Sequence, residues 1–204
     1  MDETAERFDV TEKRIREIFA EASSVHIATA ARSARTILAA AEAMRDALVR
    51  GGKIVVFGNG GSAADSQHFA AELVGRFRVA RQALSAIALT TDTSVITSIA
   101  NDFTYDQVFV RQIEALGRAG DVAFAISTSG RSRNVIDALA EARRRQLTTI
   151  ALVGSQTDGV AAAADIVISV SAESTARIQE AHRTALHAIC ELIEDHFEGA
   201  PLST

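Results

Sequence analysis

A histidine and a glutamate four residues apart are the first residues whose spacing suggests chemistry. They belong to a polar stripe that recurs at intervals of three and four, and so shares one helix face: Asp65, His68, Glu72 and Arg76. A His and a Glu at this spacing can bind one divalent metal ion, and Asp65 could orient such a ligand. The alternative is a solvated face on which Glu72 and Arg76 form an ordinary ion pair.

The last helical pattern offers partners for this pair. It reads RIQEAHRTALHAICELIE over residues 177–194 and contains Gln179 and His187. These two lie about 12 Å apart along an ideal helix axis. Both could bind one metal ion only if it lay between them, or if one ligand came from another subunit. His187 could instead be a hydrogen-bonded histidine of the core.

Two loops have the composition of phosphate sites. The first loop, FGNGGSA at residues 57–63, lies at the end of one apolar run. The second, ISTSGRSRN at residues 126–134, lies at the end of another apolar run and contains four hydroxyl side chains: Ser127, Thr128, Ser129 and Ser132. Backbone N–H groups at a helix N-terminus attract anions, and hydroxyls add donors. A helix cap alone would explain only one of these hydroxyls.

The first loop also loosely matches a dinucleotide-binding pattern through Gly58, Gly60 and Ala63. Asp92 could then bind the ribose, but it follows the glycines by roughly thirty residues where ~20 is usual. That interpretation leaves the second loop without a role, and the chain has no Gly-Lys-Ser/Thr motif of a nucleotide P-loop. A phosphorylated small molecule is the better prediction.

Composition excludes several other functions. Hydrophobic residues make up 48% of the 204 residues, and the net charge of -5 gives no footprint for nucleic acid or an anionic membrane. Cys190 is the only cysteine, so no internal disulfide is expected. The acidic start is unlike a signal peptide, and no apolar run approaches the ~18 residues of a membrane span. We therefore expect a soluble cytoplasmic protein.

The chain predicts a single α/β domain over residues 1–204. Residues 11–50 have helical periodicity and predict two long helices, divided near 23–30. Apolar runs with little alternation predict five buried strands, at 53–57, 86–89, 122–126, 149–153 and 166–170, and a last helix is expected at 174–197. Strand–helix alternation favours a parallel sheet flanked by helices on both faces, with 51–204 as its core. The spare apolar face of the N-terminal helices, residues 1–50, predicts a homo-oligomer.

Four motifs in order carry a resemblance to a known family: GNGGSAADSQHFAAELVGRF, IANDFTYD at 99–106, ISTSGRSRN and TARIQEAHRTALH. Over nearly its whole length the chain resembles the phosphoheptose isomerases (sedoheptulose 7-phosphate isomerases) of the sugar isomerase (SIS) domain family. The resemblance implies a five-stranded parallel sheet, a homotetramer with active sites near subunit interfaces, and one Zn²⁺ per subunit. It also implies conversion of sedoheptulose 7-phosphate to D-glycero-D-manno-heptose 7-phosphate, for ADP-heptose or GDP-heptose and surface polysaccharides such as lipopolysaccharide.

The resemblance also assigns residues to the site. The implied metal ligands are His68, Glu72, Gln179 and His187. The implied substrate contacts are Asn59, Gly60, Gly61, Ser62, Glu72, Asn101, Asp102, Ser127, Thr128, Ser129, Ser132 and Gln179. Two positions depart from the common pattern: Ala176 stands where some members have Asp, and Arg131 stands where Asn is common.

Aldose–ketose isomerisation through a cis-enediol needs a base beside the carbons and an acid/base group for the oxygens. We assign Glu72 as the base and His187 as its partner. A metal ion beside the two oxygens could stabilise the enediolate, although a carboxylate that binds zinc is a weaker base.

Two alternatives from other classes would use the same fold. One is a non-enzymatic SIS-domain scaffold of the kind that binds the replication initiator DnaA, and the other is a sugar-phosphate sensor without turnover. The scaffold group resembles this chain in its Gly-rich and ARIQE-like motifs but replaces the metal-binding Glu and the last His. Because Glu72 and His187 are both present, the sequence favours the isomerase.

Overall fold

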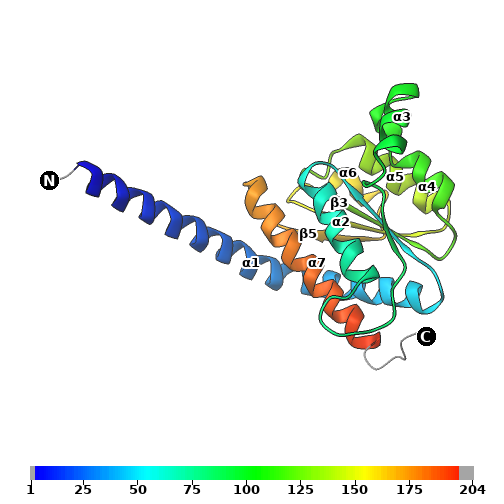
Figure 1. Cartoon of the computed structure of the whole chain (residues 1–204), viewed down its shortest axis with the longest axis horizontal. Coiled ribbons are helices and arrows are strands. Elements are labelled where there is room, and N and C mark those ends of the chain that lie inside the picture. The colour runs from blue at the N-terminus through cyan, green and yellow to red at the C-terminus, as the bar shows by residue number, and fades with distance from the viewer. Residues whose placement is uncertain (1–2, 198–204) are drawn as a thin grey trace.

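A parallel five-stranded sheet forms the centre of the molecule (Figure 1). The computed structural model describes residues 3–197, and their side chains from residue 11 onward. The strands are β1 (Ile54–Gly58), β2 (Ala86–Ala88), β3 (Val122–Ser127), β4 (Thr148–Val153) and β5 (Ile166–Ser169). They lie in the order β2-β1-β3-β4-β5, and each neighbouring pair is parallel. The five predicted strands are confirmed.

Helices cover both faces of the sheet, as predicted. The elements are α1 (Glu3–Val49), α2 (Gly61–Val74), α3 (Thr93–Asp102), the 3-10 helix η1 (Tyr105–Gln107), α4 (Val110–Leu116), α5 (Arg133–Arg144), α6 (Asp158–Ala161) and α7 (Thr175–Phe197). Side chains alternate along each strand. Ile54 and Val56 therefore pack with α1, α2 and α7, whereas Val55 and Phe57 pack with α3 to α6.

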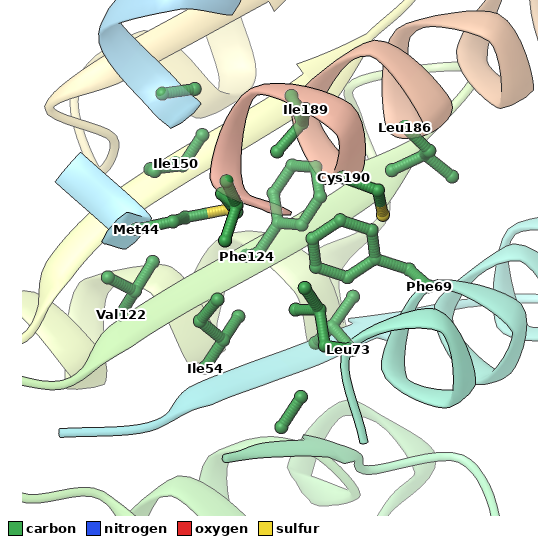
Figure 2. Packing of buried hydrophobic residues seen from close by; sticks show 14 of the residues in the cluster. Met44, Ile54, Phe69, Leu73, Val122, Phe124, Ile150, Leu186, Ile189 and Cys190 are labelled. Atoms are coloured by element: carbon green, nitrogen blue, oxygen red, sulfur yellow. The ribbon is translucent and has the colours of Figure 1, made fainter. Parts of the chain in front are cut away.

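The helices that carry the His/Glu pair and the last histidine share one core cluster (Figure 2). Phe69 of α2 packs edge-on against Phe124 of β3, with ring centroids 5.3 Å apart. Leu73 of α2 and Ile189 of α7 are also buried in this cluster. Each such side chain contributes roughly 1.5–3 kcal/mol when fully buried. This packing fixes α2 against α7.

The two predicted N-terminal helices form one continuous helix, α1, of 47 residues, so the predicted division near 23–30 is wrong. Polar side chains there are accommodated inside the helix because they bond to carbonyls of the preceding turn. Ser23 Oγ donates to the Phe19 carbonyl at 2.9 Å, and Thr29 Oγ1 donates to the Val25 carbonyl at 2.7 Å. At 1.5 Å per residue α1 is about 70 Å long, and its N-terminal part reaches away from the body (Figure 1). None of the helices in the described part of the chain could cross a membrane.

One buried carboxylate holds the segment after α2 against α7. Glu194 is 3% exposed and accepts hydrogen bonds of 2.7–3.1 Å from the backbone N–H groups of residues 77–79. Its Oε1 also lies 3.2 Å from Arg81 Nε, and Arg81 donates to the carbonyls of Glu72 and Leu73. Burial raises the pKa of Glu194, but the three N–H donors and Arg81 outweigh burial and place that pKa below its ordinary value.

We expect Glu194→Gln to lower the free energy of unfolding by about 2 kcal/mol, because three N–H groups lose a charged acceptor and buried Arg81 loses its partner. Folding lowers the pKa of Glu194. Its contribution is therefore present above the unfolded pKa and disappears as pH falls through the folded value. Chemical denaturation over a pH series measures both effects.

The control is Glu191→Gln. Glu191 lies on α7, as Glu194 does, but its carboxylate is half-exposed and pairs with Arg78. An exposed pair of this kind contributes less than about 1 kcal/mol. Equal losses of stability in the two variants would contradict the assignment.

Candidate active site

The two predicted phosphate loops are neighbours at the carboxyl edge of the sheet. They follow β1 and β3, which pair directly, with Gly58 opposite Ile126. From β1 the chain turns toward β2, and from β3 it turns toward β4 on the other side. These strand ends therefore form the topological switch point, where open α/β sheets bind their ligands. A Cβ on Gly58 would lie 2.5 Å from the Ile126 carbonyl oxygen. Only glycine fits there.

Gly60 and Gly61 bring the start of α2 against α7. Gly60 has a φ of +56°, a conformation that favours glycine, and α2 begins at the next residue. A Cβ on Gly61 would overlap Nε2 of Gln179 on α7. Ser62 is buried in the same turn, and its carbonyl accepts a hydrogen bond from the Ser66 hydroxyl. Four of the predicted site residues therefore lie together at this helix start.

Three further predicted residues meet about two to three turns along α2. His68 Nε2 lies 2.9 Å from His187 Nε2 and 3.4 Å from Glu72 Oε1. All three side chains are half-buried, and the ring of Phe77 packs on His187 with centroids 5.5 Å apart. Burial, followed by the neighbouring His68, lowers the pKa of His187. The imidazole is therefore neutral at pH 7 and can both accept and donate a proton.

This donor set suits a divalent metal ion in its chemistry and partly in its geometry. Zinc–nitrogen bonds of ~2.0–2.1 Å place two tetrahedral ligands about 3.3 Å apart. The His68–Glu72 separation matches this value, whereas the 2.9 Å between the imidazole nitrogens is a hydrogen-bond distance. Among the side chains of residues 11–197, no three His, Cys, Asp or Glu groups already surround one point. Gln179, the fourth implied ligand, lines the same groove as His187.

That groove is open, has a volume of about 980 Å³, and is lined by α1, α2 and α7. Asp65, which could have oriented a metal ligand, is buried in its wall. Its carboxylate accepts a hydrogen bond from Arg183, and no hydrogen bond joins it to His68 in the described part of the chain. Sequence reasoning missed Arg183, because nothing in its surroundings distinguishes it from an ordinary surface arginine.

The Ser/Thr loop folds back on itself at the end of β3. Ser127 Oγ accepts the Gly130 N–H, and Ser129 Oγ accepts the Arg131 N–H, both at 3.2 Å. The two hydroxyl oxygens also lie 3.5 Å apart, so one hydroxyl donates to the other and the second hydroxyl hydrogen can still be donated to a ligand. Ser132 occupies the N-cap position of α5, but its side chain makes no capping hydrogen bond. Helix capping therefore does not explain this hydroxyl.

Asn101 and Asp102 lie on the last turn of α3, exposed to solvent. Asn101 Nδ2 donates to Asp102 Oδ1 at 2.9 Å, and within residues 11–197 no hydrogen bond or ion pair joins either side chain to the His68 cluster. Asn59, in contrast, is half-buried and bonds to Asn134 and Tyr105. Both partners were missed as functional residues, although they belong to the quoted ISTSGRSRN and IANDFTYD motifs.

Asp92 has a structural role. Its Oδ1 accepts the Val95 N–H at 2.9 Å and caps the N-terminus of α3, so it does not behave as the ribose-binding acid of a dinucleotide site.

Comparison with known proteins shows the family to which the chain belongs. Residues 18–154 match the SIS domain family, a range that ends before Gln179 and His187. The phosphoheptose isomerase of Thiobacillus denitrificans is 54% identical over 155 residues, which cover 74% of this chain and 79% of that protein. The phosphoheptose isomerase of Aromatoleum aromaticum is 50% identical over 184 residues, which cover 89% of this chain and 93% of that protein. The solved phosphoheptose isomerase of Neisseria gonorrhoeae superposes with a TM-score of 0.85 at 44% identity, covering 91% of this chain and 99% of that chain.

We expect Ser132→Ala to change the free energy of unfolding by less than about 0.5 kcal/mol, because its hydroxyl does not cap α5. Asp92→Ala is the matched control: it removes a cap that is observed and should cost about 1 kcal/mol. Urea denaturation of both variants measures the difference. A loss at Ser132 as large as that at Asp92 would restore the capping interpretation.

Proposed function

We propose, since the chain belongs to the SIS domain family and within it to the phosphoheptose isomerases, that it converts sedoheptulose 7-phosphate to D-glycero-D-manno-heptose 7-phosphate. The observation that carries this proposal is the cluster of His68, Glu72 and His187, close to a Gly-rich helix start. The product would supply ADP-heptose or GDP-heptose for surface polysaccharides. Cys190 is buried and free, which suits the reducing cytoplasm that we propose as its location.

The proton transfers can be assigned to two side chains. Glu72 removes the proton from C1 of the ketose and returns it to C2, and the intermediate is a cis-enediol. Neutral His187 protonates O2 as the enediol forms and removes the proton from O1 as the aldehyde forms. Oε1 of Glu72 contacts His68, so Oε2 is the oxygen that we assign to the carbon proton.

We also propose that His68, Glu72, Gln179 and His187 hold one Zn²⁺ per subunit. When bound, the ion would supply Lewis-acid stabilisation of the two substrate oxygens. Support comes from the convergence of His68, Glu72 and His187 and from the position of Gln179 in the groove that His187 lines. In this scheme His68 takes part in no proton transfer, and its role is to bind the metal ion.

The phosphate group of the substrate is assigned to the Ser/Thr loop. Uncommitted hydroxyl hydrogens there and the backbone N–H groups at the start of α5 are the donors that phosphate prefers. Binding energy at this end can position C1 and C2 at Glu72 without taking part in the chemistry.

Proton NMR of sedoheptulose 7-phosphate in D₂O, with and without added zinc, tests the reaction. The wild-type protein should form an aldose heptose 7-phosphate, and Glu72→Gln should slow this by at least about 10²-fold, because the general base is lost. Glu180→Gln, which changes another groove carboxylate paired with Arg177, should retain activity. No product from a folded oligomer under any metal condition would exclude the isomerase and favour a scaffold that binds a protein partner.

We propose further that the chain forms a homo-oligomer, a tetramer as the family resemblance implies. The projecting part of α1 leaves Phe19 70% and Ile27 72% exposed, and both line the groove beside His187. Large apolar side chains gathered on one helix are usually buried against another protein surface, and a second copy of α1 offers the matching surface.

Ile27→Asp should therefore shift the protein to a species of lower mass in light scattering, because a charge replaces an apolar contact between subunits. Leu116→Asp, at a partly exposed leucine on α4 away from α1, is the matched control and should leave the mass unchanged. An Ile27→Asp protein of wild-type mass would contradict the assignment of α1 to the interface.

A further inference from the structure

Three segments of the site are joined by side chains that meet at Asn59. Asn59 Nδ2 donates to Asn134 Oδ1 at 2.9 Å, and Asn134 Nδ2 donates back to Asn59 Oδ1 at 3.0 Å. The hydroxyl of Tyr105 donates to the same Asn59 Oδ1 at 3.2 Å. We call Asn59, Asn134 and Tyr105 the Asn59 bracket. Its members come from the Gly-rich loop, the first turn of α5 and η1.

These bonds use most of the capacity of the Asn59 side chain. An asparagine offers two acceptor lone pairs and two N–H donors. Both lone pairs are occupied, by Asn134 and Tyr105, and one N–H is donated to Asn134. The side chain of Asn59 retains a single N–H donor, so Asn59 would bind a ligand mainly through its backbone.

The bracket is buried at one end and exposed at the other. Asn134 is 3% exposed, so its amide needs the pairing with Asn59 to offset its burial. Tyr105 is 54% exposed, so its ring adds little to the core. The hydroxyl can therefore be removed without disturbing the two loops that Asn59 and Asn134 join.

Tyr105 belongs to a segment that is attached to the body mainly by partly buried contacts: Val95, Ile96 and Ala100 of α3 pack on the core, and Arg111 of α4 lies over the ring of Phe103. In α3 only Ile99 is buried, and η1 has no buried residue. The same segment carries Asn101 and Asp102, the implied substrate contacts. A segment with little buried surface opens at low free energy unless another interaction holds it.

We propose that Tyr105 is a positioning residue that holds the segment of residues 93–107 against the Gly-rich loop through Asn59, and so presents Asn101 and Asp102 to the sugar phosphate. Asn134 fixes the orientation of the Asn59 amide, whose oxygen accepts the hydrogen bond from Tyr105 that we call the tether. The role in substrate binding rests on the proposed function, whereas the tether itself does not.

Tyr105→Phe tests the tether, because it removes the hydroxyl and keeps the ring. Hydrogen exchange measured by mass spectrometry should become faster in residues 93–107 of the variant and stay unchanged in α7. KM for sedoheptulose 7-phosphate should rise about fivefold, the effect of one lost hydrogen bond. The turnover number should change less than about twofold, because the tether acts equally on bound substrate and transition state.

The control is Thr97→Val, which removes a hydroxyl of the same segment that bonds only within α3 and should leave KM unchanged. Unchanged exchange in Tyr105→Phe would overturn the tether. Faster exchange with an unchanged KM would overturn the positioning role. If the wild-type protein performs no isomerisation, the proposed function fails, and the exchange measurement alone still decides whether the tether exists.

Discussion

The site depends on how closely α2 lies against α7. At the start of α2, the missing side chain of Gly61 lets Gln179 approach. In the middle the imidazoles of His68 and His187 touch, and beyond the end of α2 the carboxylate of Glu194 on α7 holds the following backbone. Between these points the two helices share a buried core. The spacing of the groups that we propose as catalytic is therefore set by core packing and not by a flexible loop.

The two predicted parts of the site, the Ser/Thr loop and the His68 cluster, differ in their electrostatics. The Ser/Thr loop, to which we assign the phosphate, offers hydroxyl and backbone donors. Its two arginines are engaged elsewhere: Arg131 donates to the side chain of Gln156, and Arg133 donates to Asp137. A dianion would therefore be held by oriented dipoles, whose attraction falls off quickly with distance and so selects for position. The His68 cluster joins the carboxylate of Glu72 to His68, and His68 in turn contacts the neutral imidazole of His187. A carboxylate and a neutral imidazole are the groups that proton shuttling between adjacent atoms requires.

The sequence predicts local features well and long-range contacts poorly. The strands could be recognised because strands covered on both faces consist of nearly continuous apolar residues, and His68 with Glu72 because one helix face has a fixed period. The contact of His68 with His187 joins residues of two helices whose packing only the folded core determines. The continuity of α1 was missed because serine and threonine favour helix ends as well as bonding back inside a helix. The Asp65–Arg183 and Tyr105–Asn59 contacts depend on tertiary packing that no local pattern encodes.

The groove combines two surfaces of different chemistry. On the α7 side, Gln179, Arg183 and His187 offer polar groups, whereas the α1 side presents Phe19 and Ile27. A polyhydroxylated sugar would leave its hydroxyls without partners against the apolar side, and unpartnered polar groups are costly to bury. The apolar side is therefore better suited to a protein surface than to the substrate. Covering it with a second copy of the chain would exclude water from the polar side, where the proton transfers are assigned, and would couple assembly to the completion of the site.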